Sequence, residues 1–100
     1  MVMIREIFFC KPGQVRPMVE KFKAMNTLTE KLGFGKSRIM TDVSAERYWT
    51  VVSEWEVASL GAFEEMMKGT AMQNKEFEEI MKDYHNFVES GRREIYTIEA

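Results

Sequence analysis

The sequence predicts an α+β fold in which four strands and two helices follow the order βαββαβ. Three observations support this order: a β-branched and aromatic segment stops at Pro12-Gly13, two segments have helical periodicity, and two neighbouring segments form a hairpin pattern. Right-handed crossovers then place the first and third strands at the centre of an antiparallel four-stranded sheet, with both helices on one face. This is the ferredoxin-like sandwich, and we expect residues 1–100 to form a single domain of this kind.

The first strand and the first helix are marked by composition and spacing. Residues 2–11, VMIREIFFCK, are rich in β-branched and aromatic side chains and predict a strand. From Val15, apolar residues recur at helical spacing as far as Leu32. Pro17 suits a first helical turn and Gly33 suits a left-handed stop, so a helix is expected over 15–32.

Residues 36–43 and 47–57 predict a hairpin around a turn at 44–46. Side chains of the second segment alternate between two faces of the strand. The more apolar face, which we expect to meet the helices, has Trp49, Val51 and Trp55. The other face, expected on the open side of the sheet, has Tyr48, Thr50, Val52 and Glu54.

A second, longer helix is expected to begin after Ser59, which is a suitable N-cap. Its apolar stripe is interrupted at Gly69-Thr70 and resumes at Phe77, which predicts a kink or a break near Gly69. The helix is expected to end at Ser90-Gly91. Residues 92–99, RREIYTIE, are then expected to form the last strand.

Composition favours a cytoplasmic globular protein. Hydrophobic residues make up 45% and charged residues 30%, no apolar run has the length of a membrane helix, and no signal peptide is expected before Arg5. Cys10 is the only cysteine, so we expect neither a disulfide nor a metal site, and no cofactor. Basic residues are not clustered as in proteins that bind the phosphate backbone, so nucleic acid is not an expected partner.

The open face of the predicted sheet is half-apolar. Such a face is too apolar to be simply solvated and too polar to form an ordinary core. We therefore expect two copies of the chain to meet through their open faces and to enclose a cavity between them. The expected assembly is a homodimer, and the expected ligand is a hydrophobic small molecule.

Two segments resemble a known superfamily. IREIFFCKPGQVRPMVEKF, a strand that runs through Lys-Pro-Gly into a helix, resembles the start of NIPSNAP-type and related dimeric α/β-barrel proteins. RYWTVVSEWEVASLGAFEEM, a strand that ends in Trp-Glu before a helix, resembles the same superfamily, which includes proteins similar to the antibiotic-biosynthesis monooxygenases. The resemblance implies a dimer whose two open sheets close an eight-stranded barrel, and activities such as cofactor-free monooxygenation, heme degradation and isomerisation.

The heme-degrading members of that superfamily provide three positions for comparison. Where they have an asparagine on the first strand, this chain has Glu6, and where they have a tryptophan early in the second helix, it has Met66. Where they have the heme-ligating histidine, it has Met81 or Ile80. Because all three positions differ, the comparison does not favour heme degradation.

Glu6 and Glu54 are the leading catalytic candidates, because both are expected on the open side of neighbouring central strands. A carboxylate in a partly apolar cavity has its pKa raised and can act as a base. The alternative is that both form salt bridges, with Arg5, Arg38 or Arg93 as partners.

His85 is a third catalytic candidate, because histidine titrates near neutral pH. It is expected either to serve as a general base or a metal ligand at the cavity mouth, or to be a surface or boundary histidine. The candidate substrate-binding residues are Tyr48, Thr50, Val52, Phe8 and Met66.

Two classes of function follow from these expectations. One is a homodimeric barrel that transforms a hydrophobic small molecule by monooxygenase-like or isomerase-like chemistry. The other is a barrel that binds a ligand or serves as a scaffold without catalysis. An RNA-binding module has the same βαββαβ order, but residues 47–55, RYWTVVSEW, lack the Gly-Phe pattern of such modules, so this third function is not favoured.

Overall fold

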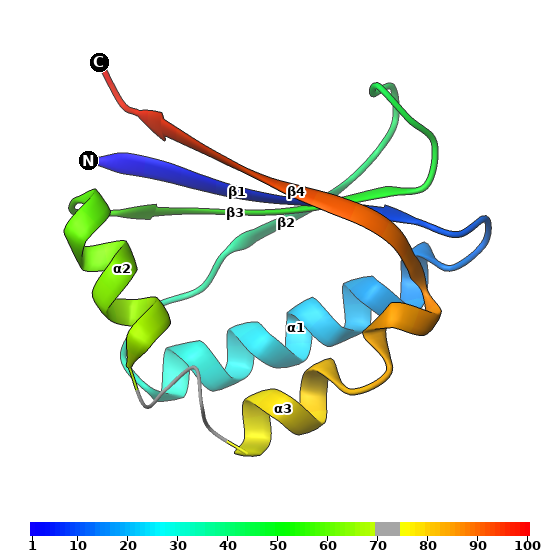
Figure 1. The fold of residues 1–100 in the computed structure, drawn as a ribbon, viewed down its shortest axis with the longest axis horizontal. Coiled ribbons are helices and arrows are strands. Elements are labelled where there is room, and N and C mark those ends of the chain that lie inside the picture. The colour runs from blue at the N-terminus through cyan, green and yellow to red at the C-terminus, as the bar shows by residue number, and fades with distance from the viewer. Residues whose placement is uncertain (70–74) are drawn as a thin grey trace.

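A computed structural model describes residues 1–69 and 75–100. The strands form one antiparallel sheet in the order β2-β3-β1-β4, with β1 and β3 at its centre as predicted. All helices lie on one side of this sheet and leave the other side open, which is the ferredoxin-like α+β fold (Figure 1). Among the described residues, no helix combines the length and the apolar character needed to cross a membrane. The elements are β1 (Val2–Cys10), α1 (Val15–Lys31), β2 (Arg38–Thr41), β3 (Thr50–Val57), α2 (Leu60–Lys68), α3 (Lys75–Met81), the 3-10 turn η2 (Tyr84–Asn86) and β4 (Val88–Thr97).

The first strand and the first helix lie where the sequence predicts them. The helix ends as expected before Gly33, whose φ of +86° is in the left-handed region. The Gly33 N–H donates to the carbonyl of Glu30 at 3.1 Å, which satisfies one of the terminal carbonyls of the helix. The predicted helix is thus confirmed to within one residue of each boundary.

The main core lies between the central strands and α1. Met18 of α1 and Val51 of β3 have no exposed surface, and Phe22 packs with them. The Phe22 ring lies 5.3 Å from that of Phe8, centroid to centroid, in a tilted arrangement. Cys10 is part of the same cluster, and burial, with a smaller contribution from the charge of Asp42, raises the pKa of its thiol.

The register of β1 and β3 divides their side chains between the two faces of the sheet. Directly opposed residues share a face, and side chains alternate along each strand. The helix-covered face has the pairs Ile4–Trp55, Glu6–Ser53 and Phe8–Val51. The open face has the pairs Arg5–Glu54, Ile7–Val52 and Phe9–Thr50.

The hairpin differs from its prediction at Trp49. Val51 and Trp55 do meet the helices, but β3 begins only at Thr50, and the Trp49 side chain is 43% exposed. The φ of Trp49 is +63°, so the chain turns at this residue instead of extending through it. Two hydrogen bonds fix the turn: the Thr50 N–H donates to Asp42 Oδ1, and the Cys10 N–H donates to the carbonyl of Trp49, both at 2.8 Å.

The predicted second helix is divided, and it ends earlier than expected. Ser59 is its N-cap, with its hydroxyl accepting the N–H of Ala62 at 3.1 Å, and α2 ends just before Gly69, which confirms the predicted break. The helix expected over 70–74 lies outside the described residues. The end at Ser90-Gly91 is wrong, because Asp83 has a left-handed φ of +66° and β4 already begins at Val88.

Candidate ligand-binding pocket

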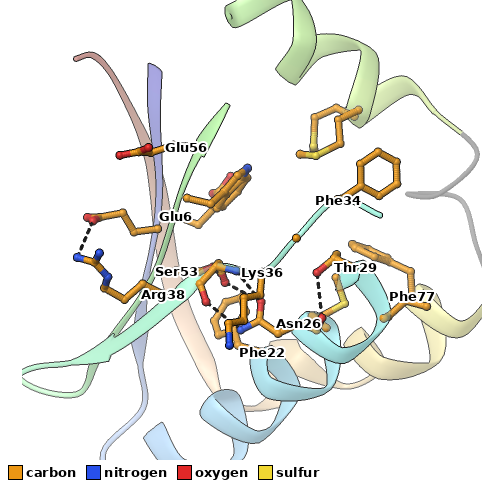
Figure 2. Close-up of a pocket in the computed structure, with 18 of the residues that line it drawn as sticks. Glu6, Phe22, Asn26, Thr29, Phe34, Lys36, Arg38, Ser53, Glu56 and Phe77 are labelled. Carbon is orange, nitrogen blue, oxygen red and sulfur yellow. Dashed lines mark hydrogen bonds and ion pairs between the residues drawn. The ribbon is translucent and has the colours of Figure 1, made fainter. Parts of the chain in front are cut away.

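A pocket of about 830 Å³ lies between the sheet and the helices of a single chain (Figure 2). The sheet forms its floor, and residues of all three α-helices and of the segment between α1 and β2 form its walls. This position differs from the expected one, because the cavity was predicted on the open face. Its apolar lining includes Phe8, Phe22, Met25, Leu28, Leu32, Phe34, Trp55, Met66, Met67, Phe77 and Met81.

A row of polar side chains crosses the floor of this apolar pocket. Glu6 of β1 is directly opposite Ser53 of β3 on one side and Arg93 of β4 on the other. All three residues line the pocket and stand on the helix-covered face. We call Ser53, Glu6 and Arg93 the polar row. On the floor of the pocket, this row places hydrogen-bonding groups between apolar neighbours such as Phe8 and Trp55.

Ser53 begins a chain of hydrogen bonds that leads from the floor into the pocket wall. Ser53 is buried, with only 4% of the residue exposed, and its hydroxyl donates to Ser37 Oγ at 2.8 Å. The Ser37 hydroxyl in turn donates to Asn26 Oδ1 of α1 at 3.0 Å. A serine hydroxyl has one hydrogen, so Ser53 can present only a lone pair to the pocket.

The Glu6 carboxylate forms an ion pair and a hydrogen bond with Arg93 through Oε1. Within the described part of the chain, Arg93 is its only cationic partner. The Arg93 guanidinium also lies 5.1 Å above the centre of the Phe63 ring, which holds it between the sheet and α2. The carboxylate is thus charge-neutralised on one oxygen, and its second oxygen can accept a hydrogen bond from a ligand.

The lining of the pocket continues past the edge of β3. Strand β2 pairs with β3 only from Arg38, opposite Glu54, onwards, so Trp55–Val57 have no strand neighbour on that side. Arg38, Glu54 and Glu56, at this edge, are also lining residues. In Figure 2, Arg38 and Glu56 point away from the helices, on the opposite side of the strands from Phe34. Charged side chains are therefore found at this edge of the pocket.

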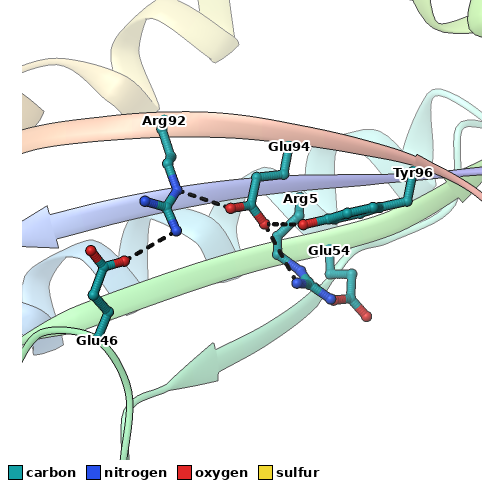
Figure 3. A network of polar contacts seen from close by, with 6 residues as sticks. All are labelled: Arg5, Glu46, Glu54, Arg92, Glu94 and Tyr96. Atoms are coloured by element: carbon teal, nitrogen blue, oxygen red, sulfur yellow. Dashed lines mark hydrogen bonds and ion pairs between the residues drawn. The ribbon is translucent and has the colours of Figure 1, made fainter.

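The open face of the sheet carries a network of ion pairs (Figure 3). Arg5 contacts Glu54 at 2.9 Å and Glu94 at 3.6 Å, and Arg92 contacts Glu94 at 2.9 Å. The Tyr96 hydroxyl donates to Glu94 at 2.8 Å. That hydrogen bond is the largest cause of the lowered pKa of Glu94, and burial opposes it. The same contact raises the pKa of Tyr96.

Glu6 and Glu54 do not share a face, so the expectation that both lie on the open side is wrong for Glu6. The reason is the register, which pairs Glu6 with Ser53 and places Glu54 opposite Arg5. The alternative of salt bridges is confirmed for both carboxylates. Glu6 pairs with Arg93, and Glu54 pairs with Arg5 at 2.9 Å and with Arg38 at 3.9 Å.

The other candidate residues separate into two groups. Phe8 and Met66 line the pocket, but Phe8 stands on the helix-covered face, not on the open one. Among the described lining residues of the pocket, the remaining candidates Tyr48, Thr50, Val52 and His85 are not found.

Three of those candidates have other surroundings. Tyr48 is 84% exposed and precedes β3, so its predicted place within the strand is wrong. Thr50 is buried on the open side, where its hydroxyl donates to the carbonyl of Arg47 at 2.9 Å. His85 is exposed, and its ring lies 3.9 Å from that of Tyr84, as the surface alternative expects.

Sequence reasoning did not identify Ser53, Ser37, Asn26 and Phe34 as pocket residues. Small polar residues in a strand or helix have no pattern that separates a pocket floor from a surface. A usable signal was the alternation itself, because Ser53 shares a face with Val51 and Trp55. The described residues hold no group of three or more histidine, cysteine, aspartate or glutamate side chains placed to bind a metal.

Comparisons with known proteins agree with the fold. No family model matches the chain, and no curated protein matches its sequence. The structure is similar to a NIPSNAP domain protein from Burkholderia xenovorans, with a TM-score of 0.81, 10% identity, and coverage of 100% of this chain and 96% of that one. It is also similar to a NIPSNAP family protein from Agrobacterium tumefaciens strain C58. Here the TM-score is 0.77 at 13% sequence identity, and the alignment covers 96% of this chain and 90% of that one.

An antibiotic biosynthesis monooxygenase also has a similar structure. Its TM-score is 0.62 at 12% identity, and the alignment covers 100% of both chains. At such identities the likeness establishes a common fold. The resemblance that the sequence motifs indicate is therefore confirmed at that level: the chain has the NIPSNAP-like, ferredoxin-like α+β fold.

Proposed function

We propose that this chain binds a largely apolar small molecule that presents a hydrogen-bond donor, such as a hydroxyl group, to the polar row of its pocket. The observation that carries the proposal is the placement of Glu6 and Ser53 side by side on an otherwise apolar floor. Apolar walls supply most of the affinity of such sites, and a few polar groups orient the ligand.

The ligand group is a donor because the floor presents acceptors. Ser53 uses its hydrogen on Ser37, and Glu6 has a carboxylate oxygen beyond the one that Arg93 contacts. Directly opposed strand residues have Cβ atoms about 5 Å apart, so a hydroxyl group at this place can donate its single hydrogen to either acceptor, and the charged Glu6 carboxylate is the stronger of the two. A ligand carboxylate would instead bring a second negative charge beside Glu6, at a place where Arg93 is already paired.

Calorimetric titration with octanol and with octanoate tests this proposal. The parent protein is expected to bind octanol, and to bind octanoate at least about tenfold more weakly, because like charges repel in the pocket. Glu6→Gln should weaken octanol binding about 5–10-fold, since a hydrogen bond to a charged acceptor is stronger than one to a neutral acceptor. Glu20→Gln, an exposed change of the same chemistry on α1, is the matched control and should bind like the parent.

Two results would overturn the proposal. One is that the parent protein binds neither probe at any concentration the probes allow. The other is that Glu6→Gln binds octanol as tightly as Glu20→Gln does, because the affinity would then not depend on the polar row.

A catalytic role for Glu6, of the monooxygenase-like or isomerase-like kind, is the second candidate. It is favoured by the apolar surroundings of this carboxylate and by the fold, which an antibiotic biosynthesis monooxygenase also has. We place binding first because the ion pair with Arg93 already neutralises the Glu6 charge. Formation of a product from a bound ligand, and its loss in Glu6→Gln, would reverse this order.

Our proposal for the assembly is a homodimer that covers the open face and closes a barrel. Ile7 and Phe9 form an apolar centre of this face, and Val52 stands beside Ile7. Arginine side chains lie over the Phe9 ring, with the Arg47 guanidinium 4.4 Å from its centre. Ile7 and Phe9 are already only 7% exposed in the single chain, so a second copy would chiefly cover Val52 and exclude water from the ion pairs around them.

A further inference from the structure

We propose that the ligand is elongated, with its donor group at the polar row and an alkyl chain that passes Phe34 into a second hollow between α2 and the end of α1. This inference rests on the proposed function and names the ligand class of the same site. Its basis is a second hollow of about 880 Å³ that adjoins the pocket. The two share Leu32, Phe34, Trp55 and Met66 as lining residues.

Strand β3 connects the two hollows. Its helix-facing residues Ser53, Trp55 and Val57 follow one another in a line. Ser53 lines the pocket, Trp55 lines both hollows, and Val57 lines the second one. At the rise of a strand, the line from Ser53 to Val57 is about 13 Å long. A ligand whose donor group lies on Ser53 and whose chain follows β3 therefore reaches the second hollow.

The second hollow is suited to an alkyl chain. Ala58 and Ala62 line it with small apolar side chains. Among its described lining residues, Glu65 alone is charged. The members of the polar row are found only in the first pocket. The two hollows thus differ in chemistry along their length: hydrogen-bonding groups at one end and an apolar channel at the other.

Phe34 stands at the junction of the two hollows, where its ring is half-exposed. Figure 2 shows it on the helix side of the pocket, beside α2. The glycines on both sides of it have φ values of +86° and +76°, a conformation that side-chain-bearing residues rarely adopt. These two residues, Gly33 and Gly35, hold the backbone in the shape that places the ring at this junction. An alkyl chain that crosses here packs against an aromatic face.

A chain-length series tests the inference. Primary alcohols from hexanol to dodecanol are titrated into the parent protein, into Ala62→Leu and into Ala24→Leu. In the parent, affinity should rise about fourfold per added methylene up to the longest alcohol, because each methylene is buried. Ala62→Leu fills the second hollow, so its affinity should stop rising at a shorter alcohol, and dodecanol should bind at least fourfold more weakly than to the parent.

Ala24→Leu is the matched control, since Ala24 is exposed on α1 and belongs to neither described lining. Its affinity should rise up to the longest alcohol as in the parent, and hexanol should bind equally to all three proteins. An affinity that rises with chain length in Ala62→Leu as far as it does in Ala24→Leu would overturn the elongated ligand and leave the proposed function standing. A parent protein that binds no alcohol, hexanol included, would overturn both.

Discussion

The hydrogen bond between Tyr96 and Glu94 controls the titration of a carboxylate on the open face. It is the largest cause of the lowered pKa of Glu94. Tyr96→Phe should therefore raise the pKa of Glu94, which NMR titration of its carboxyl carbon measures. Tyr48→Phe, a substitution of the same kind at an exposed position, should leave this pKa unchanged.

The sign of the effect on stability follows from the direction of the pKa shift. A carboxyl group with a lowered pKa in the folded state stabilises the protein above its unfolded-state pKa, and this contribution disappears as the pH falls through the folded-state pKa. The difference in unfolding free energy between the parent and Tyr96→Phe should thus be present at neutral pH and shrink in acid. A difference that stays constant down to low pH would contradict this cause.

Trp49 holds a backbone conformation that suits glycine. Its φ is +63°, and the left-handed region costs a side-chain-bearing residue about 1–2 kcal/mol. Trp49→Gly should therefore be more stable than Trp49→Ala by about 1 kcal/mol, measured by urea unfolding. An alanine variant as stable as the glycine variant would show that this turn carries no strain.

Residue identities predicted the ion pairs better than they predicted the pocket. The sequence offered Arg5, Arg38 or Arg93 as salt-bridge partners for the two glutamates, and Glu6 does pair with Arg93, which lies on the edge strand β4. Which face Glu6 occupies depends on the strand register, and a shift of one residue reverses every side chain. The alternation of side chains from Tyr48 onwards predicted a strand that already includes Trp49. The strand begins only at Thr50, because the chain turns at Trp49.

Among the contacts between secondary-structure elements, Lys21 connects α1 to the end of α3. Its ammonium group donates to the carbonyl of Ile80 at 2.8 Å and to that of Lys82 at 2.5 Å. Carbonyls at a helix C-terminus have no partner within the helix, so this lysine replaces the missing donors. The contact fixes the wall of the pocket that Phe77 and Met81 provide.

Lys21→Met keeps the apolar stem and removes the donors. Its unfolding free energy should fall by about 1–2 kcal/mol, and amide hydrogen exchange in α3 should accelerate. Lys23→Met is the control, because Lys23 is exposed and has a solvated pair with Glu20 at 3.5 Å, a kind of pair that contributes little. Equal exchange rates of α3 in the two variants would show that Lys21 does not hold this helix.

The order of elements could be predicted, but the end of the second helical region could not. Phe77, Ile80 and Met81 have helical spacing that continues through Tyr84, so periodicity alone predicts an uninterrupted helix. The structure ends α3 at Met81 because Asp83 takes a left-handed conformation, which aspartate tolerates better than most residues. The packing that selects this conformation is not visible in a local sequence window.

At the scale of the whole molecule, the uncovered face of the sheet predicts self-association. Light scattering over a range of concentrations should give twice the mass of one chain. Val52→Lys places a charge in the centre of the open face and should shift the equilibrium to the monomer, because the charge would be buried without a partner. Ala24→Lys, on an exposed helix position, should remain dimeric. A parent protein that is monomeric at every concentration would contradict the barrel.

The pocket on the helix-covered face is the centre of this account, and a crystal structure with bound decanol tests it most directly. The hydroxyl group is expected to donate its hydrogen to the Glu6 carboxylate on the floor of the pocket, with the alkyl chain along β3 past Trp55 towards Phe34. An alcohol bound in the opposite direction, with its hydroxyl group away from Glu6 and its alkyl chain on the polar row, would contradict this orientation.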